Sequence, residues 1–277
     1  MPKQRSREHQ AFLALADGRS HYRIDGPPGA AVVLLLHGAT VPAWEFDRIV
    51  PHLTGAGFRT LRLDLYGHGL SDRPRLEYGH GLFVRQVTQF LAKLGIDEPV
   101  HVLGHSLGAA IAARVACLQP HRFSRLILAA PLLDFTVHRP AVRVLHLPLL
   151  GEILMRLYVE PMLIRRRTQR YRDIEDGRFV GLFMEQLRKP GFGRALLSLI
   201  RSGGLADQRA CYEALGATDH PVLVLRGVGD DIVTPDQIAT IRTLVPRAGY
   251  VEIGGTAHAF LMTHPERVAP AVLDFLR

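Results

Sequence analysis

One serine lies in a pattern suited to nucleophilic chemistry. Ser106 is the centre of Gly104-His105-Ser106-Leu107-Gly108, which has the form G-x-S-x-G and stands between the apolar run Val100–Leu103 and the small residues Ala109–Ala113. This pattern is typical of a sharp turn from a strand into a helix, where two glycines leave room for the serine hydroxyl to project. We predict that Ser106 is a nucleophile.

A serine hydroxyl needs a base to remove its proton, and the base needs an acid to orient it. His258 lies in the glycine-rich stretch Gly254–Phe260, directly after the expected strand Tyr250–Ile253. A histidine in a loop beyond a strand end can reach a nucleophile at the same edge of a sheet. His264 is the nearest alternative, but Pro265 follows it and indicates the start of the last helix. We predict that His258 is the general base.

The orienting acid should lie between the serine and the histidine in chain order. Asp230 and Asp231 both follow the apolar run Pro221–Leu225, and consecutive side chains point in different directions, so only one of them can face His258. We favour Asp230. Asp134 is a third candidate, although capping the start of the following segment is the simpler interpretation of that residue.

Catalysis by such a serine also requires N–H donors for the oxyanion that forms in the transition state. The backbone N–H of Leu107, next to the nucleophile, is one candidate. The second is the N–H of Ala39, in the turn after the apolar run Ala31–Leu36. We expect the His37 imidazole to hold this turn, and we expect the glycine-containing loop Asp64–Asp72 to be structural.

The elements that must position these residues alternate between strands and helices. Each candidate residue follows an apolar run, as expected where parallel strands end at one edge of a sheet. The predicted class is therefore an α/β fold with a mostly parallel, doubly wound sheet. The expected strands are Ser20–Ile24, Ala31–Leu36, Phe58–Leu63, Val100–Leu103, Arg125–Ala129, Pro221–Leu225 and Tyr250–Ile253, and the expected helices include Leu82–Leu94, Pro235–Leu244 and Pro265–Leu276.

The segment 132–205 breaks this alternation, because it contains several predicted helices and no good strand. We interpret it as a helical cap inserted into a core formed by residues 1–131 and 206–277. Its apolar residues could line an acyl pocket or could only pack the cap onto the core. Those that we single out as candidate substrate-binding residues are Leu147, Leu150, Leu154 and Met155.

The net charge of the chain is +8, and the cap segment carries much of the excess, with 13 arginine and lysine residues against 7 aspartate and glutamate residues. A solvated helical surface is the simpler interpretation of this excess. Contact of the basic cap with an anionic membrane surface is an alternative. No nucleic-acid-binding motif accompanies the charge, and we expect no nucleic acid partner.

Composition limits the remaining classes of protein. Hydrophobic residues make up 47% of the chain and charged residues 22%, as in a folded soluble protein. Cys117 and Cys211 are too few for a disulfide framework and lie in no metal-binding spacing. The basic, polar N-terminus resembles no signal peptide, and no apolar run is long enough to span a bilayer. We expect a cytoplasmic protein without a metal or cofactor, and the sequence carries no signal for its oligomeric state.

Taken together, these motifs resemble those of the α/β-hydrolase superfamily over the whole chain apart from the cap. The matching elements, in order, are His37-Gly38 after a buried strand, D-x-x-G-x-G-x-S from Asp64 to Ser71, G-H-S-L-G around Ser106, G-x-x-D from Gly227 to Asp230, and G-x-x-H ending at His258. The resemblance implies a serine hydrolase and supports Asp230 over Asp231. Haloalkane dehalogenases and epoxide hydrolases of this fold carry aspartate at the nucleophile position, which argues against both activities.

The resemblance is strongest to esterases and lipases acting on small or monoacyl apolar esters. Carbon–carbon bond hydrolases of this fold usually carry more glycines after His-Gly than Ala39-Thr40 offers, which makes them a weaker alternative. Cofactor-free haloperoxidases or perhydrolases share the same three catalytic residues and are a further alternative. A non-catalytic protein that senses a ligand with a retained hydrolase fold is an alternative of another class.

Overall fold

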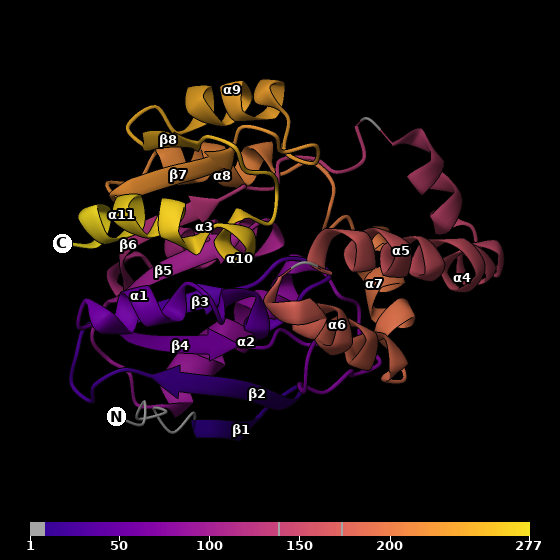
Figure 1. Cartoon of the computed structure of the whole chain (residues 1–277), viewed down its shortest axis with the longest axis horizontal. Coiled ribbons are helices and arrows are strands. Elements are labelled where there is room, and N and C mark those ends of the chain that lie inside the picture. Colours follow the sequence, from indigo (N-terminus) through magenta and orange to yellow (C-terminus); the bar gives the residue numbers. More distant parts are fainter. Residues whose placement is uncertain (1–8, 138, 173) are drawn as a thin grey trace.

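In the computed structural model, eight strands form one sheet at the centre of the molecule (Figure 1). The order of the strands is β1-β2-β4-β3-β5-β6-β7-β8. The structure describes residues 9–137, 139–172 and 174–277. β1 and β2 pair antiparallel at one edge, and the six strands from β4 to β8 are parallel. The strands are β1 His9–Leu15, β2 Gly18–Asp25, β3 Val32–Leu36, β4 Arg59–Leu63, β5 Val100–His105, β6 Phe123–Ala129, β7 Val222–Gly227 and β8 Gly249–Ile253.

Helices cover both faces of this sheet, so the predicted fold class is confirmed. Across the sheet, the chain moves in one direction from β3 to β4 and in the other direction from each later parallel strand to the next. Because crossovers between parallel strands are right-handed, α1, which connects β3 to β4, lies on the face of the sheet opposite to the later connecting helices. Helices α2, α3, α8 and α9 pack in series, whereas α1 packs against α11. These helices are α1 Val50–Gly55, α2 His80–Lys93, α3 Leu107–Leu118, α8 Arg209–Gly216, α9 Pro235–Leu244, α10 Phe260–Thr263 and α11 Pro265–Leu276.

The sequence prediction missed strand β1. Ala11–Leu15 follow the basic N-terminal residues and are all apolar, so the sequence shows no alternation of apolar and polar residues, although exposed positions do alternate with half-buried or buried ones in the strand. β1 pairs only with β2, and its Phe12 side chain remains 52% exposed. An edge strand of this kind needs less hydrophobic patterning than a strand buried on both faces.

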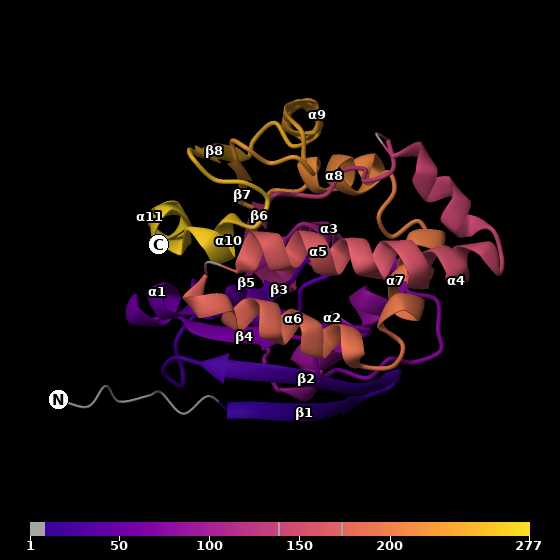
Figure 2. The same ribbon diagram turned by 45° about the vertical axis from the view of Figure 1, so that its right-hand side comes forward.

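The helices between β6 and α8 gather at one end of the molecule (Figures 1 and 2). A π-helical turn, η4 Met155–Val159, joins α4 to α5, and the remaining contacts run from α5 to α6, from α6 to α7 and from α4 to α7. These helices are α4 Leu150–Leu154, α5 Glu160–Tyr171, α6 Arg178–Arg188 and α7 Phe192–Arg201, with short 3₁₀ turns at Pro140–His146 and Glu175–Gly177. The division of the chain into a core and a cap at 132–205 remains a prediction.

The two ends of this helical segment lie beside each other. The Phe135 N–H donates to the carbonyl of Leu205 at 2.9 Å, and the Gln208 N–H donates to the carbonyl of Leu133 at 2.8 Å. The chain therefore leaves the sheet after β6 and returns towards α8 at nearly the same place.

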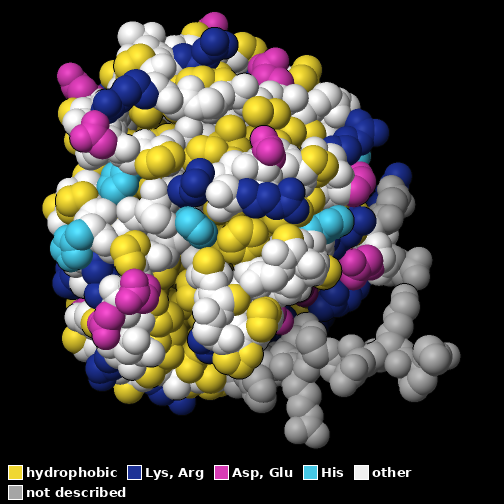
Figure 3. Space-filling view, turned by 90° about the vertical axis from the view of Figure 1, so that its left-hand side faces the viewer, with side chains coloured by type: hydrophobic (Ala, Val, Ile, Leu, Met, Phe, Trp, Pro, Cys, Tyr) yellow, Lys and Arg dark blue, Asp and Glu magenta, His cyan; other side chains and the backbone are white. Residues whose placement is uncertain are grey.

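Surface charge is mixed on the face remote from α4–α7, where side chains of both signs are interspersed with apolar ones (Figure 3). In the part of the chain that the structure describes, no helix is both long enough and apolar enough to cross a bilayer.

Candidate active site

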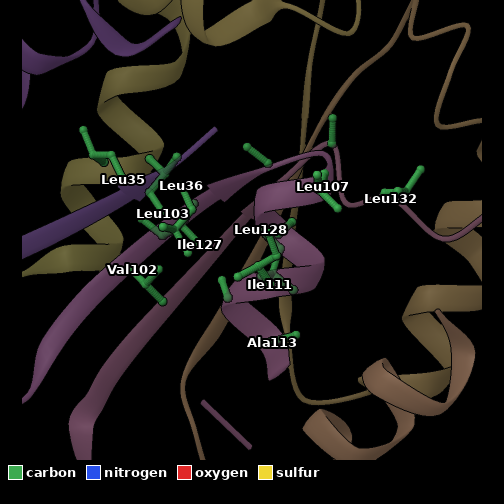
Figure 4. Packing of buried hydrophobic residues seen from close by; sticks show 14 of the residues in the cluster. Leu35, Leu36, Val102, Leu103, Leu107, Ile111, Ala113, Ile127, Leu128 and Leu132 are labelled. Atoms are coloured by element: carbon green, nitrogen blue, oxygen red, sulfur yellow. The ribbon is translucent and has the colours of Figure 1, made fainter. Parts of the chain in front are cut away.

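Ser106 lies at the turn between β5 and α3, with φ 52° and ψ −113°. This left-handed φ is uncommon for a residue other than glycine, and the surrounding backbone holds it in place. The Ser106 N–H donates to the carbonyl of Ala129 at 2.9 Å, and the Leu132 N–H donates to the carbonyl of Ser106 at 3.3 Å. The turn therefore rests on the end of β6, and leucines of β3, β5, β6 and α3 pack beneath it (Figure 4).

The glycines on either side of Ser106 are required by close backbone contacts. A Cβ at Gly104 would lie 2.3 Å from the carbonyl oxygen of Gly108, and one at Gly108 would lie 2.0 Å from that of Leu36. Only glycine allows α3 to start so close to β3 and β5. This packing sets the serine at the point where the strand order reverses, the usual ligand site of such sheets.

His258 and Asp230 form a buried pair. The Nδ1 atom of His258 lies 2.8 Å from Asp230 Oδ2, and Asp230 Oδ1 accepts the N–H groups of Ile232 and Val233 at 2.8 and 3.0 Å. The carboxylate therefore accepts a hydrogen bond from Nδ1–H, which leaves Nε2 of the imidazole as the basic atom. Burial is the largest influence on the pKa of His258 and lowers it, and although the hydrogen bond and charge of Asp230 raise that pKa, it stays below its ordinary value. Burial alone would raise the pKa of Asp230, but the contact with His258 and the two N–H donors lower it.

Of the three aspartates considered from sequence, only Asp230 contacts His258. The Asp231 side chain is 66% exposed and lies 3.5 Å from Arg170 Nη2. Asp134 Oδ1 accepts the N–H groups of Thr136 and Val137, which makes a turn at the start of the helical segment, as the simpler interpretation expected. His264 precedes α11 and bonds to Thr263, not to any of these groups.

The loop of His258 packs against the serine turn through His105, the residue before Ser106. The rings of His105 and His258 lie 4.8 Å apart between centroids, and His105 Nε2 lies 2.9 Å from the carbonyl oxygen of His258. Within the described ranges the Ser106 hydroxyl makes no hydrogen bond, either to His258 or to another group. Such contacts often tighten only when substrate binds.

The two predicted oxyanion donors come from two segments beside Ser106. Leu107 begins α3, and Ala39 lies in the loop after β3. A Cβ at Gly38 would lie 3.5 Å from Ser106 Cβ, which shows that this loop touches the serine turn. Neither the Leu107 N–H nor the Ala39 N–H is paired with another described group, so both donors are free for an oxyanion.

His37 and Asp64 have the structural roles expected of them. The Leu65 N–H donates to His37 Nε2 at 2.9 Å, which leaves the proton on Nδ1 to donate to the carbonyl of Gly38. Asp64 accepts the N–H groups of Ala43 and Leu70 and pairs with the His21 imidazole. These contacts outweigh burial and hold the pKa of Asp64 well below its usual range.

Sequence reasoning missed Glu45. This buried carboxylate lies with Oε1 2.8 Å from His105 Nδ1, and its Oε2 accepts the Gly38 N–H at 3.1 Å. Burial would lower the pKa of His105, but the charge and hydrogen bond of Glu45, the carbonyl of His258 and the charge of Asp230 together raise that pKa. Glu45 thus connects the Ala39 loop, the serine turn and the His258 loop. The only signal in the sequence is a lone charge among the apolar residues of η1 Ala43–Phe46.

Sequence reasoning also missed two residues through which the helical segment contacts the Ala39 loop. Gln186 of α6 donates to the carbonyl of Thr40 at 2.7 Å and accepts the Gly69 N–H at 2.9 Å. Arg167 of α5 donates through Nη2 to Thr40 Oγ1 at 2.7 Å and through Nη1 to Tyr171 Oη at 2.8 Å. These contacts bring α5 and α6 over the loop after β3.

The four candidate substrate-binding residues occupy different environments. Leu147 and Leu150 are 51% and 41% exposed, Leu154 is half-buried, and Met155 is buried. Met155 also lines a cleft of about 1120 Å³ with Glu160, Phe192 and Arg201, and Ser106 is not among the lining residues. No contact within the described ranges brings any of the four beside Ser106, so their role in substrate binding remains a prediction.

The fold agrees with the comparisons to known proteins. A model of the alpha/beta hydrolase family matches residues 33–271, and the chain therefore belongs to this family. Among curated relatives, it is 26% identical to a non-heme chloroperoxidase of Streptomyces lividans, covering 96% of this chain and 99% of that protein. It is 27% identical to a pimeloyl-[acyl-carrier protein] methyl ester esterase of Neisseria meningitidis, covering 93% of this chain and 97% of that protein.

A solved structure of a hydrolase from Pseudomonas aeruginosa shares the fold, with a TM-score of 0.77 and 23% identity over 97% of this chain and 98% of the other. The match to the family model thus establishes an alpha/beta hydrolase, whereas the activities of the two curated relatives differ from each other.

Proposed function

We propose that this chain is a serine hydrolase that cleaves carboxylic esters through an acyl-enzyme on Ser106. The observation that carries the proposal is the buried His258–Asp230 pair, packed through His105 against a strained serine turn. Strained serine, oriented imidazole and free N–H donors are the groups that acyl transfer needs. The esterase relative supports the same class of reaction.

In the first half of the reaction, His258 Nε2 takes the Ser106 proton as the hydroxyl oxygen attacks the ester carbonyl carbon. The carbonyl oxygen becomes an oxyanion held by the N–H groups of Leu107 and Ala39. When the tetrahedral intermediate collapses, the bond to the alcohol oxygen breaks and His258 gives its proton to the leaving alcohol.

In the second half, water attacks the acyl-enzyme while His258 takes one of its protons. Collapse of the second intermediate releases the carboxylic acid and returns the proton to Ser106. Asp230 holds the His258 tautomer throughout and stabilises the imidazolium that forms in each half.

A second candidate is perhydrolysis, in which hydrogen peroxide replaces water as the nucleophile that attacks the acyl-enzyme. The similarity to a chloroperoxidase over almost the full length of both chains supports this second candidate. Both reactions require the same acyl-enzyme, so they differ only in the second half.

The test is turnover of 4-nitrophenyl esters of graded acyl length, together with labelling by a fluorophosphonate probe that reacts with activated serines. We expect the wild type to hydrolyse the esters and to be labelled, and Ser106→Ala to do neither. Ser124→Ala, on β6 away from the turn, is the matched control and should retain both properties. A wild type that is neither active nor labelled, or a labelled Ser106→Ala variant, would rule out the mechanism.

A further inference from the structure

Arg167 places a positive charge at the edge of the candidate active site. It extends from α5 to the loop after β3, where Nη2 donates to Thr40 Oγ1, one residue beyond the oxyanion candidate Ala39. Its Nη1 donates to the hydroxyl of Tyr171. Both partners are neutral oxygens, and a guanidinium has five N–H donors, so three donors are left over.

The carboxylates around the site are already paired with other cations or with imidazoles. Glu45 contacts His105, Asp230 contacts His258, and Asp231 lies beside Arg170. Within the described ranges no carboxylate lies within 4 Å of Arg167. A half-buried guanidinium without a carboxylate partner is a typical binding group for an anionic ligand.

Arg167 is close enough to the base to influence it. Burial is the main cause of the lowered pKa of His258, and the positive charges of His105 and Arg167 lower that pKa further. An anion bound at Arg167 would therefore lie within electrostatic range of the reacting atoms.

We propose that Arg167, with the hydroxyls of Thr40 and Tyr171, binds a free carboxylate on the substrate, so that the preferred substrates are esters of carboxylate-bearing acids. A monoanion fits this position better than a phosphate dianion, because the neighbouring Arg170 lies beside Asp231 and adds no second free cation. This inference rests on the proposed ester hydrolysis and goes beyond it by naming the substrate class.

The test compares two 4-nitrophenyl esters of equal acyl length, the glutarate half-ester and the neutral valerate. For the wild type we expect kcat/KM to favour the glutarate half-ester about tenfold or more. Arg167→Gln should lower this preference about 10- to 100-fold, the range of a charge-assisted contact, and Arg167→Lys should restore part of it. Arg166→Gln is the matched control, because Arg166 is exposed on the same helix and should leave the preference unchanged.

Direct binding separates this inference from the proposed reaction. Glutarate should raise the melting temperature of the wild type and of Ser106→Ala, but not that of Arg167→Gln. Equal losses for both esters in Arg167→Gln would mean that Arg167 only holds α5 on the loop, and the inference would fail. Binding of glutarate through Arg167 without ester turnover would support the inference while removing the proposed reaction. Absence of both the preference and the binding would overturn the inference even if ester turnover is strong.

Discussion

Asp230 and Asp231 are adjacent in the chain but have different surroundings. The two N–H groups of Ile232 and Val233 fix Asp230 against His258, whereas Asp231 points to solvent near Arg170. The resemblance to the family's G-x-x-D pattern favoured Asp230, and the contacts provide a physical reason for the difference between the two residues. The choice between the two depends on the local turn, which brings only one carboxylate under the imidazole.

Asp230→Asn should lower kcat about a thousandfold or more, because the amide no longer favours the His258 tautomer that presents a basic Nε2. Asp231→Asn should change kcat less than about twofold, since it removes only an exposed contact. Single-turnover and steady-state rates on one ester would measure both. Equal losses in the two variants would contradict this assignment of roles.

The pH dependence should follow the imidazole of His258. Only the neutral ring accepts the serine proton, so kcat/KM should rise with pH as His258 loses its proton. Because burial lowers the pKa of His258 from its ordinary 6.5, the acid limb should have its midpoint below 6.5. The measurement is kcat/KM against pH at a wavelength where nitrophenol and nitrophenolate absorb equally. A midpoint above 6.5 would show that the charge of Asp230 outweighs burial.

At the scale of elements, the serine turn depends on the close approach of α3 to β3. Gly108→Ala would put a methyl group 2.0 Å from the Leu36 carbonyl oxygen, so the start of α3 would have to move. We expect a loss of about 2 to 3 kcal/mol in the free energy of unfolding and a loss of ester turnover, because the Leu107 N–H moves with the helix.

Chemical denaturation of Gly108→Ala beside Gly254→Ala measures this effect. Gly254 lies in the His258 loop, and a Cβ there would meet nothing within 4 Å, so its variant should lose less than about 0.5 kcal/mol. Similar stabilities for the two variants would mean that α3 is not held by this contact.

Elements with strong local signals were predictable to the residue. The helices Pro235–Leu244 and Pro265–Leu276 match their predicted bounds, because proline favours the first turn of a helix and its position marks the start. The buried parallel strands were found from their apolar runs, with ends that differ by one to a few residues. β1 was missed because an edge strand with one exposed aromatic residue carries little of that signal.

At the scale of the whole molecule, local patterns could not predict contacts between distant segments. Glu45 follows β3 and His105 ends β5, and the two residues meet because these strands are neighbours in the sheet. In the chain, β4 and α2 lie between the two strands. Arg167 reaches Thr40 only because α5 crosses above the loop after β3. The excess of arginine in residues 132–205 is visible in the sequence. Which of these arginines contacts the loop after β3 depends on how the helices α4 to α7 pack, and the sequence does not show this.

The backbone hydrogen bonds that join Leu133 to Gln208 and Phe135 to Leu205 affect how such a protein can diverge. Since the helical segment departs and returns at one place, its replacement by another segment would leave the register of β6 and β7 unchanged. Recombination at this junction could therefore introduce new substrate preferences in a single step. Ser106, Asp230 and His258 would be inherited intact, because all three lie outside the exchanged stretch.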